Sequence, residues 1–398
     1  MKKRVGLLIS TLNSGGAERV VSRLSNILND EYEIFVILFE DTYIKYDYYG
    51  KLINIDVKAI NNNIISKVGL PFKRAYRLKG IKKDLKLDVV ISFLDSPNIV
   101  NILSKVKKCK TIISVRNYSN KEKQLSKLTR VIDFCMRILY KKADKIIPVS
   151  EVIKDSLIND YKVDKNKIDV IYNPYDIEEI NYLAEENICI EHEEFMNSEK
   201  IFISVGRQMY QKGFWHLVKA FKIVNDSIPD TKLVIVGEDF QNGLVQNLVN
   251  ELGIQNSVLL TGYQKNPFKY IKRSSVYVLS SMFEGFPNSM AESLVCGCPV
   301  IAVDCKSGPR EILLKKNRMD REILGFIEAD YGILVEELSN IECWDRNKID
   351  SSDIKLANAM QYLINNKKLI EVYSKKGKKR SENFNYKTCK EKFIKIIE

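Results

Sequence analysis

The sequence has no apolar run approaching 18 residues, so its pattern excludes a membrane-spanning helix. The first ten residues, MKKRVGLLIS, resemble the start of a secretion signal. However, the apolar run stops at Ser10 and a polar loop follows without a cleavage site. We therefore expect a cytoplasmic protein that is either soluble or peripheral to a membrane.

Histidine is nearly absent, and the cysteines form no paired framework. The chain has only His192 and His216, and its eight cysteines are scattered over 398 residues. This usage is typical of a reducing compartment, in which most cysteines act as small core residues. The group Cys296, Cys298 and Cys305 has no histidine nearby, so we expect no metal site.

Positive charge is concentrated in the first part of the chain. Residues 1–172 hold 33 Lys+Arg and 19 Asp+Glu, a net charge of +14, whereas the remaining residues hold 30 and 32, a net charge of −2. A basic half joined to a neutral half indicates an anionic partner for the basic half alone, either nucleic acid or an anionic membrane surface. Lysine-rich codon usage is an equally good explanation of the excess.

Short apolar runs alternate with helical patterns along most of the chain, which is typical of parallel sheets covered by helices. The sequence predicts an α/β protein with two doubly wound, Rossmann-like domains. Its expected strands are residues 5–9, 34–39, 88–93, 111–115 and 145–149, then residues 201–205, 232–236, 257–260, 276–279 and 299–303.

The strand pattern also predicts the domain boundaries. Residues 1–172 form the first domain, and the acidic segment 173–199, poor in strand signal, forms a linker. Residues 200–375 form the second domain, and residues 376–398 form a C-terminal helix that packs back on the first domain. Ligands of such sheets bind at the carboxyl ends of the strands, so we expect a cleft between two facing domains.

Three segments at expected strand ends carry chemistry. In residues 11–18, TLNSGGAE, two glycines expose amide groups where a helix begins, which suits an anion, although a plain turn capped by Ser14 also fits. The pattern is not GxGxxG, so no dinucleotide site is indicated. In residues 205–213, VGRQMYQKG, Arg207 and Lys212 suit a diphosphate.

The third segment is residues 283–292, FEGFPNSMAE. Glu284 lies in a loop, and Glu292 lies on an otherwise apolar helix, where a charge needs a reason. Carboxylates accept hydrogen bonds from sugar hydroxyls, and Pro287 fixes the turn that opens the helix toward an anion.

Together the three segments resemble retaining glycosyltransferase family 4, which has the GT-B fold. Gly206, Arg207, Lys212 and Gly213 match the family pattern G-R-x4-K-G, and Glu284 with Glu292 match E-x7-E. The Gly15-Gly16 opening resembles that of capsule and O-antigen members. The resemblance extends over nearly the whole chain.

The resemblance implies a role for each matching residue. Arg207 and Lys212 hold the donor diphosphate and stabilise the leaving nucleotide, Glu284 contacts the transferred sugar, and Glu292 holds the ribose. It implies a nucleotide-sugar substrate, UDP-linked as the first choice, and no metal or other cofactor. The remaining donor-binding residues are Gly15, Gly16, Gly206, Tyr263, Gln264, Gly285, Phe286, Pro287, Asn288 and Ser289.

One family feature is missing. Many members carry a histidine in the first domain that faces the transferred sugar, but this chain has Arg116-Asn117 at the expected position. The family's role for that histidine therefore has no carrier here, and we expect Arg116 or Asn117 to take over its binding role.

The acceptor is expected to bind the basic first domain. Residues 67–86 and 121–142 read as amphipathic basic helices, either resting on anionic lipid or simply solvated. We predict a polyprenyl-diphosphate-linked saccharide acceptor at the inner face of the cell membrane, in surface polysaccharide assembly. A soluble or protein acceptor is the alternative.

Other activities fit the sequence less well. It contains no recognition motif for nucleic acid, so we expect no nucleic-acid partner. The two family patterns together argue against a nucleotide-sugar epimerase, and no pyridoxal-phosphate lysine motif supports a phosphorylase. Intact Arg207, Lys212 and Glu284 argue against a catalytically silent scaffold.

Overall fold

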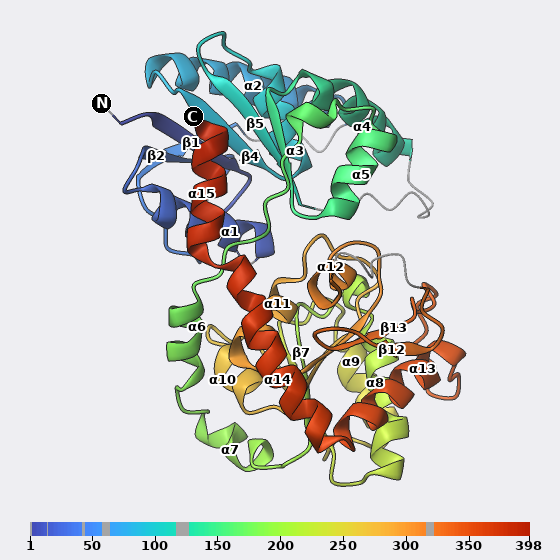
Figure 1. The fold of residues 1–398 in the computed structure, drawn as a ribbon. Coiled ribbons are helices and arrows are strands. Elements are labelled where there is room, and N and C mark those ends of the chain that lie inside the picture. The colour runs from blue at the N-terminus through green and yellow to red at the C-terminus, as the bar shows by residue number, and fades with distance from the viewer. Residues whose placement is uncertain (1, 14, 42–43, 58–63, 117–126, 316–321) are drawn as a thin grey trace. The chain divides into compact units, whose positions relative to one another are not determined.

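The computed structural model describes residues 2–13, 15–41, 44–57, 64–116, 127–315 and 322–398, with only the backbone described for residues 64–68 and 127–132. The chain divides into unit 1, Met1–Pro174 with Tyr386–Glu398, and unit 2, Tyr175–Asn385 (Figure 1). Each unit is built around one sheet with helices packed against it.

Unit 1 contains a six-stranded parallel sheet in the order β3-β2-β1-β4-β5-β6. The chain order reverses between β1 and β4, so their carboxyl ends flank the point where ligands of doubly wound sheets bind. The strands are β1 (Arg4–Ile9), β2 (Glu33–Leu38), β3 (Lys51–Asn54), β4 (Val89–Phe93), β5 (Lys110–Val115) and β6 (Lys145–Pro148).

Helices pack on both faces of this sheet. Consecutive residues of a strand point to opposite faces, and in these strands the residues on both faces are apolar. Leu7 and Ile9 of β1 belong to an apolar cluster that includes α1 and α15, whereas Leu8 packs on the other side with Ala75 and Leu78 of α2. The helices of unit 1 are α1 (Gly16–Leu28), α2 (Ile64–Asp84), α3 (Asp95–Leu103), α4 (Lys127–Leu139), α5 (Glu151–Asn159) and α15 (Tyr386–Ile397), with short turns η1 (Tyr140–Lys142) and η2 (Lys165–Lys167).

Unit 2 contains a seven-stranded sheet in the order β12-β13-β11-β10-β7-β8-β9, parallel except for the β12–β13 pair. The strands are β7 (Ile201–Val205), β8 (Lys232–Val236), β9 (Val258–Gly262), β10 (Val276–Leu279), β11 (Val300–Val303), β12 (Phe326–Glu328) and β13 (Ile333–Val335). One large apolar cluster joins alternate residues of the central strands to the helices that follow β7 and β13.

The helices of unit 2 are α6 (Ile177–Ala184), α7 (Ile190–Met196), α8 (Phe214–Ser227), α9 (Leu244–Glu251), α10 (Phe268–Lys272), α11 (Asn288–Cys296), α12 (Pro309–Leu313), α13 (Ser351–Ile364) and α14 (Lys367–Ser381), with turns η3 (Tyr210–Lys212) and η5 (Glu382–Phe384). The segment 173–199, predicted as a linker, differs from that prediction. Most of it folds as α6 and α7 within unit 2, where Asn266 donates to the carbonyl of Leu183 at 2.7 Å.

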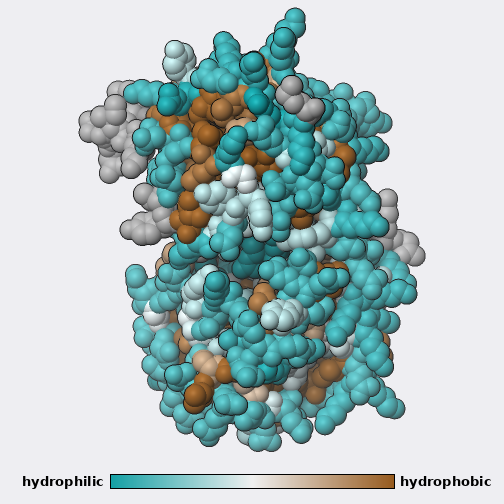
Figure 2. Space-filling view, turned by 90° about the vertical axis from the view of Figure 1, so that its left-hand side faces the viewer, coloured by the Kyte–Doolittle hydropathy of each residue, from teal (hydrophilic) through white to brown (hydrophobic). Residues whose placement is uncertain are grey.

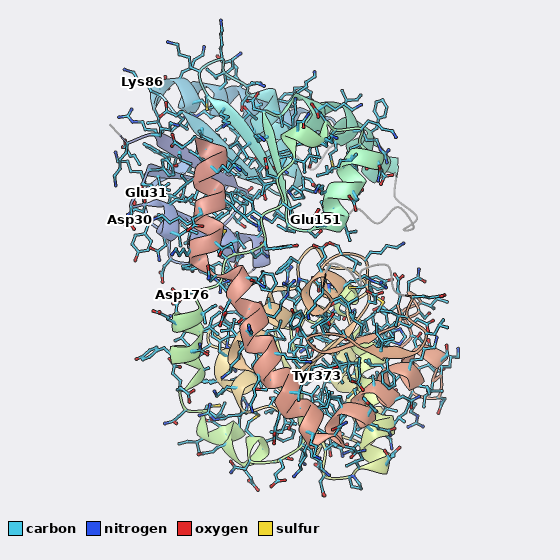
Figure 3. The ribbon with its side chains drawn as sticks, viewed as in Figure 1. Asp30, Glu31, Lys86, Glu151, Asp176 and Tyr373 are labelled. Atoms are coloured by element: carbon cyan, nitrogen blue, oxygen red, sulfur yellow. The ribbon has the colours of Figure 1, made fainter. Side chains whose placement is uncertain are left out.

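The predicted C-terminal helix, residues 376–398, is split at Asn385. Helix α14 ends in unit 2, and α15 belongs to unit 1, beside α1 (Figure 1). The apolar side of α15 is buried, and Lys390 pairs with Asp30 at 3.8 Å and Glu31 at 3.2 Å. Figure 3 labels Asp30 and Glu31 beside this helix. Unit 1 is therefore completed by the last helix of the chain.

No helix in the described part of the chain combines the length and the apolar character that a membrane-spanning segment needs. On the face drawn in Figure 2, exposed hydrophobic residues form separate patches, and the largest of these patches lies on unit 1.

A buried polar network crosses the α2–α3 side of unit 1. The Lys82 ammonium donates to the side-chain oxygen of Asn101 at 2.7 Å and to the backbone carbonyl of Asn101 at 3.1 Å. Asn101 donates in turn to Ser92 of β4, and Ser92 donates to Asn98. Since these residues are almost completely buried, each polar atom needs such a partner.

This network predicts a pH dependence of stability. Burial lowers the pKa of the Lys82 ammonium from 10.5 to about 8. Between these pH values the unfolded chain binds more protons than the folded chain, so the contribution of Lys82 to the free energy of unfolding rises with pH. The free energy of unfolding of wild type minus that of Lys82→Met should therefore rise by on the order of 3 kcal/mol between about pH 7.5 and 10.5.

Urea unfolding followed by circular dichroism at several pH values measures this difference. Lys79→Met, which removes an exposed lysine from the same helix, is the matched control and should show no such rise. A pH-independent difference for Lys82→Met would contradict the prediction.

Candidate active site

The carboxyl ends of β7, β8 and β9 meet through backbone hydrogen bonds. Gly206 donates to the carbonyl of Val236 at 2.9 Å, and Gly237 donates to that of Gly262 at 2.9 Å. A Cβ at Gly237 would overlap the carbonyl oxygen of Gly206, and one at Gly206 would come within 2.6 Å of Lys212 Cε. Glycine is therefore required at position 237, where the obstacle is backbone, whereas a Cβ at position 206 would displace the Lys212 side chain.

Lys212 and Glu284 form an ion pair at the centre of this edge. The ammonium lies 2.7 Å from Glu284 Oε1, and the Ser281 hydroxyl donates to the same oxygen at 2.8 Å. The lysine side chain is 16% exposed and that of the glutamate 9%, so the pair is largely shielded from water yet open on one side. A residue predicted for diphosphate thus contacts one predicted for the sugar.

The loops that carry these two residues are joined by further hydrogen bonds. Ser280 donates to the carbonyl of Lys212 at 2.7 Å, Met282 donates its amide to that of Gln211 at 2.8 Å, and Gln211 donates to Phe283 at 2.9 Å. Gly213 has φ of 60°, and a Cβ there would overlap the Ser280 carbonyl. The Lys212–Glu284 pair is therefore held from both backbones.

Arg207 differs from Lys212 in its surroundings. It is exposed, and among the described residues it has neither a hydrogen-bond nor an ion-pair partner. Its guanidinium lies over the ring of Phe240, 5.8 Å from the ring centroid. The full charge of this arginine is consequently available to an anion.

Helix α11 brings Glu292 into the interior of unit 2, where it is 1% exposed. Burial raises the pKa of the Tyr277 hydroxyl well above its ordinary range, and the charges of Glu284 and Glu292 raise it further. The two carboxylates therefore lie near the same buried tyrosine.

The residues between the two carboxylates are held within unit 2. Gly285 accepts a hydrogen bond from Ser307 at 2.7 Å, and the Phe286 ring packs edge-on against Phe384. Pro287 precedes the first turn of α11, and a Cβ at Gly308 would come within 2.5 Å of its ring.

The first two residues of α11 are anchored by their side chains. Asn288 accepts from the Tyr175 hydroxyl at 2.6 Å, and Ser289 donates to the carbonyl of Val205 at 3.0 Å. The Asn288 side-chain oxygen and the Ser289 hydroxyl therefore fix the start of α11 to the chain around Tyr175 and to the end of β7.

Tyr263 and Gln264 follow β9. The Tyr263 side chain is 47% exposed, and Gln264 donates back to the carbonyl of Thr261 at 3.0 Å. The structure thus places both at the same strand edge as Arg207.

In unit 1, Gly15 and Gly16 open α1 as predicted. Gly15 has an extended backbone, and a Cβ on it would overlap the carboxylate of Glu18. A side chain of α1 itself thus lies over this turn. Ser14, the alternative cap, lies outside the described residues.

Arg116 is 7% exposed at the end of β5. Its guanidinium donates to Ser114 at 2.9 Å and to the side chain of Asn173, and it lies over the Phe93 ring, 5.1 Å from the centroid. Arg116 is therefore a built-in part of unit 1 rather than a surface cation. Asn117 lies outside the described residues.

Both histidines lie in unit 2. His192 contacts the Tyr270 hydroxyl at 2.9 Å, and His216 contacts Asp353 at 2.5 Å and donates to the carbonyl of Ser339 at 2.9 Å. His216, Asp350 and Asp353 are close enough to share a cation, but the two aspartates form the capping box of α13. Helix capping accounts for this cluster without an ion.

Sequence reasoning missed three residues that shape the site: Ser281, Phe240 and Ser307. Ser281 lies three residues before Glu284 in the same loop, and this position is the only feature of the sequence that indicates a role in the site. Phe240 is an aromatic residue in the polar loop after β8, a signal that was available. Ser307, with φ of 73°, becomes apparent only through its bond to the glutamate loop.

Two families match this chain. Residues 14–179 match Glycosyltransferase Family 4, and residues 189–324 match Glycosyl transferases group 1. These ranges contain β4 and β5 of unit 1 and, in unit 2, Arg207, Lys212, Glu284 and Glu292.

Curated relatives match over nearly the full length. A glycosyltransferase of Methanocaldococcus jannaschii is 32% identical over 381 residues, 92% of this chain and 93% of the relative. The N-acetylgalactosamine-N,N'-diacetylbacillosaminyl-diphospho-undecaprenol 4-alpha-N-acetylgalactosaminyltransferase of Campylobacter jejuni is 30% identical over 387 residues, 96% of each chain.

Solved structures share the fold. A glycosyltransferase of Rickettsia africae superimposes with a TM-score of 0.74 at 19% identity, covering 100% of this chain and 98% of that one. The Anabaena protein HepE, in complex with UDP and glucose, gives 0.74 at 15% identity and covers 99% of each chain. From these similarities and the two Rossmann-like sheets, the chain belongs to glycosyltransferase family 4 and is a glycosyltransferase with the GT-B fold.

Proposed function

We propose that this glycosyltransferase moves a hexose or N-acetylhexosamine, with retention of configuration, from a UDP-sugar to a lipid-linked saccharide during surface polysaccharide assembly. The observation that carries the donor part is the Lys212–Glu284 ion pair beside the exposed Arg207 at one sheet edge. Two cations suit a diphosphate, and a carboxylate beside them suits sugar hydroxyls.

In the proposed mechanism the cations stabilise the leaving nucleotide. Arg207 presents a planar fork to the phosphate oxygens, and Lys212 adds a point charge. An ammonium has three donors, so Lys212 can keep Glu284 and still reach a phosphate. These fixed cations then stabilise the negative charge that develops on the departing diphosphate. In a retaining reaction with same-face attack, stabilisation of the leaving group is the main catalytic contribution. We propose that no metal is required.

The carboxylates divide the rest of the donor. Glu284, oriented by Lys212 and Ser281, accepts hydrogen bonds from the transferred sugar, and Glu292 accepts from the ribose. The backbone of residues 285–289 meets the sugar and phosphate, and Tyr263 and Gln264 lie near the base. For unit 1 we propose Gly15 and Gly16 as phosphate contacts and Arg116 as a sugar or acceptor contact.

The acceptor proposal draws on relatives and on unit 1. The Campylobacter jejuni relative is named for an undecaprenol-diphosphate-linked acceptor and for the transfer of N-acetylgalactosamine. Helix α2 exposes Phe72 and Tyr76, at 62% and 84%, on the same side as cations without ion-pair partners among the described residues. These cations are Lys73, Arg77, Lys79 and Lys83.

Exposed aromatic rings among uncompensated cations suit an anionic membrane surface. On α4, Phe134 and Ile138 are also exposed, at 63% and 46%. We therefore propose that unit 1 rests on the inner face of the cell membrane, where a lipid-linked acceptor is presented. A soluble or protein acceptor is the second candidate and needs no such surface.

Arg207→Ala should weaken binding of the donor. A hydrogen bond to a charged group contributes about 1.5–3 kcal/mol, so we expect a Kd roughly 10- to 100-fold higher. Isothermal titration with UDP-hexoses, UDP-N-acetylhexosamines and the corresponding GDP-sugars measures this loss. Lys376→Ala, an exposed cation on α14, is the control and should bind like wild type. If wild type binds none of the panel and Arg207→Ala changes nothing, the donor proposal fails.

Glu284→Gln should separate the sugar from the nucleotide. The amide keeps the shape of the carboxylate but loses its charge, so we expect transfer to slow by roughly 10- to 100-fold. Affinity for UDP, which has no sugar, should change by less than about three-fold, because Lys212 is released rather than removed. Measuring the transfer rate, together with the Kd for UDP and for the UDP-sugar, tests this. Equal losses for both ligands would mean that Glu284 supports the nucleotide instead.

Membrane binding is tested by sedimentation with anionic vesicles at low salt. Each lysine or arginine near an anionic surface contributes about 1 kcal/mol, so Lys73→Glu with Arg77→Glu should lower partitioning by more than roughly 25-fold. Tyr182→Ser, an exposed aromatic on α6 of unit 2, should leave it unchanged. If wild type does not bind, the membrane proposal fails and the soluble or protein acceptor becomes the better candidate.

A further inference from the structure

Phe240 lies in the loop after β8, outside every family pattern of the sequence. Its side chain is 53% exposed. A single exposed apolar residue needs no explanation in itself. This one, however, lies under the Arg207 guanidinium: the ring centroid is 5.8 Å from the guanidinium carbon, which is within cation–π range.

The backbone fixes the two residues relative to each other. Gln208, next to Arg207, donates its amide to the carbonyl of Glu238 at 2.8 Å and accepts from the amide of Phe240 at 3.1 Å. The two hydrogen bonds flank Asp239 and together make a parallel bridge between Gln208 and Asp239. The ring is thus carried to the guanidinium by paired main chains rather than by a free loop.

The far side of the loop is fixed as well. The Asp239 carboxylate accepts from the amide of Gln241 at 2.7 Å and that of Gly243 at 2.6 Å. Asn242 and Gly243 both have positive φ, 53° and 81°, which forms a tight turn. The Gln241 side chain donates to Glu342 at 2.9 Å, which ties the loop to the segment after β13.

An aromatic partner and a carboxylate partner have different effects on a cation. Glu284 orients Lys212 but also neutralises part of its charge and takes one donor. The Phe240 ring orients Arg207 through its face, so all five N–H donors and the full charge of the arginine remain for a ligand. Holding a long side chain before the ligand arrives reduces the ordering cost of binding.

We propose that Phe240 is a positioning residue: its ring holds the Arg207 guanidinium ready to form a bidentate contact with the diphosphate of the donor. The inference rests on the proposed function, because it assigns a partner to Arg207 within the same donor site. Phe240 acts through Arg207 and not on the nucleobase.

A double-mutant cycle tests this assignment. The Kd for UDP is measured by isothermal titration for wild type, Phe240→Leu, Arg207→Gln and the double variant. Phe240→Leu, which removes the ring but keeps the apolar volume, should raise the Kd roughly two- to five-fold. In the Arg207→Gln background the same change should have an effect below about 1.5-fold, since the ring then has no cation to hold.

Two further variants sharpen the outcome. Phe240→Tyr keeps an aromatic face and should restore binding to within about two-fold of wild type, and Tyr182→Leu in unit 2 should bind like wild type. Equal losses from Phe240→Leu in both backgrounds would overturn the proposal and place the ring against the nucleobase. No loss in either background would also overturn it.

The cycle separates this inference from the proposed function. If wild type binds UDP and Arg207→Gln weakens that binding while Phe240→Leu does not, the donor site stands and only the role of Phe240 fails. If wild type binds none of UDP, GDP and ADP, the proposed donor site itself fails.

Discussion

The ion pair between Lys212 and Glu284 is the constraint on which the candidate site of unit 2 depends. It requires the loop after β7 and the loop after β10 to meet, although 72 positions separate the two residues in the chain. Breaking a buried pair by removing one partner costs about 3–5 kcal/mol, because the other charge is left uncompensated. The surrounding glycines and serines serve the same contact: Gly206 and Gly213 leave room for it, and Ser280 and Ser281 bind its two sides.

Much of the fold follows from short apolar runs in the sequence. Each expected strand is found, with bounds shifted by a residue or two at most, because buried parallel strands have continuous apolar sequences. Strands β3, β12 and β13 were not expected. Strands β3 and β12 are four and three residues long and have no completely buried residue, so no apolar run indicates them. Strand β13 is a completely buried apolar run, but it is only three residues long.

The site was less predictable than the fold, for a physical reason. Spacing within one segment indicates Arg207 with Lys212, and Glu284 with Glu292, but contacts between segments depend on tertiary packing. The sequence could not show that Lys212 meets Glu284, nor that Arg116 is enclosed by Ser114, Asn173 and Phe93. An arginine after a strand reads as a surface cation until its neighbours are known.

The chain passes from unit 2 back into unit 1 after Asn385, and this connectivity determines which segments can be exchanged between related enzymes. Tyr175 and Asn385, the first and last residues of unit 2, lie in a parallel bridge, and Tyr175 donates its amide to Phe384 at 2.9 Å. Unit 2 is therefore one uninterrupted insert with adjoining ends, whereas unit 1 is assembled from two stretches of chain. A recombination event or a designed chimaera can replace unit 2 as a single cassette, but a replacement for unit 1 must bring its own α15.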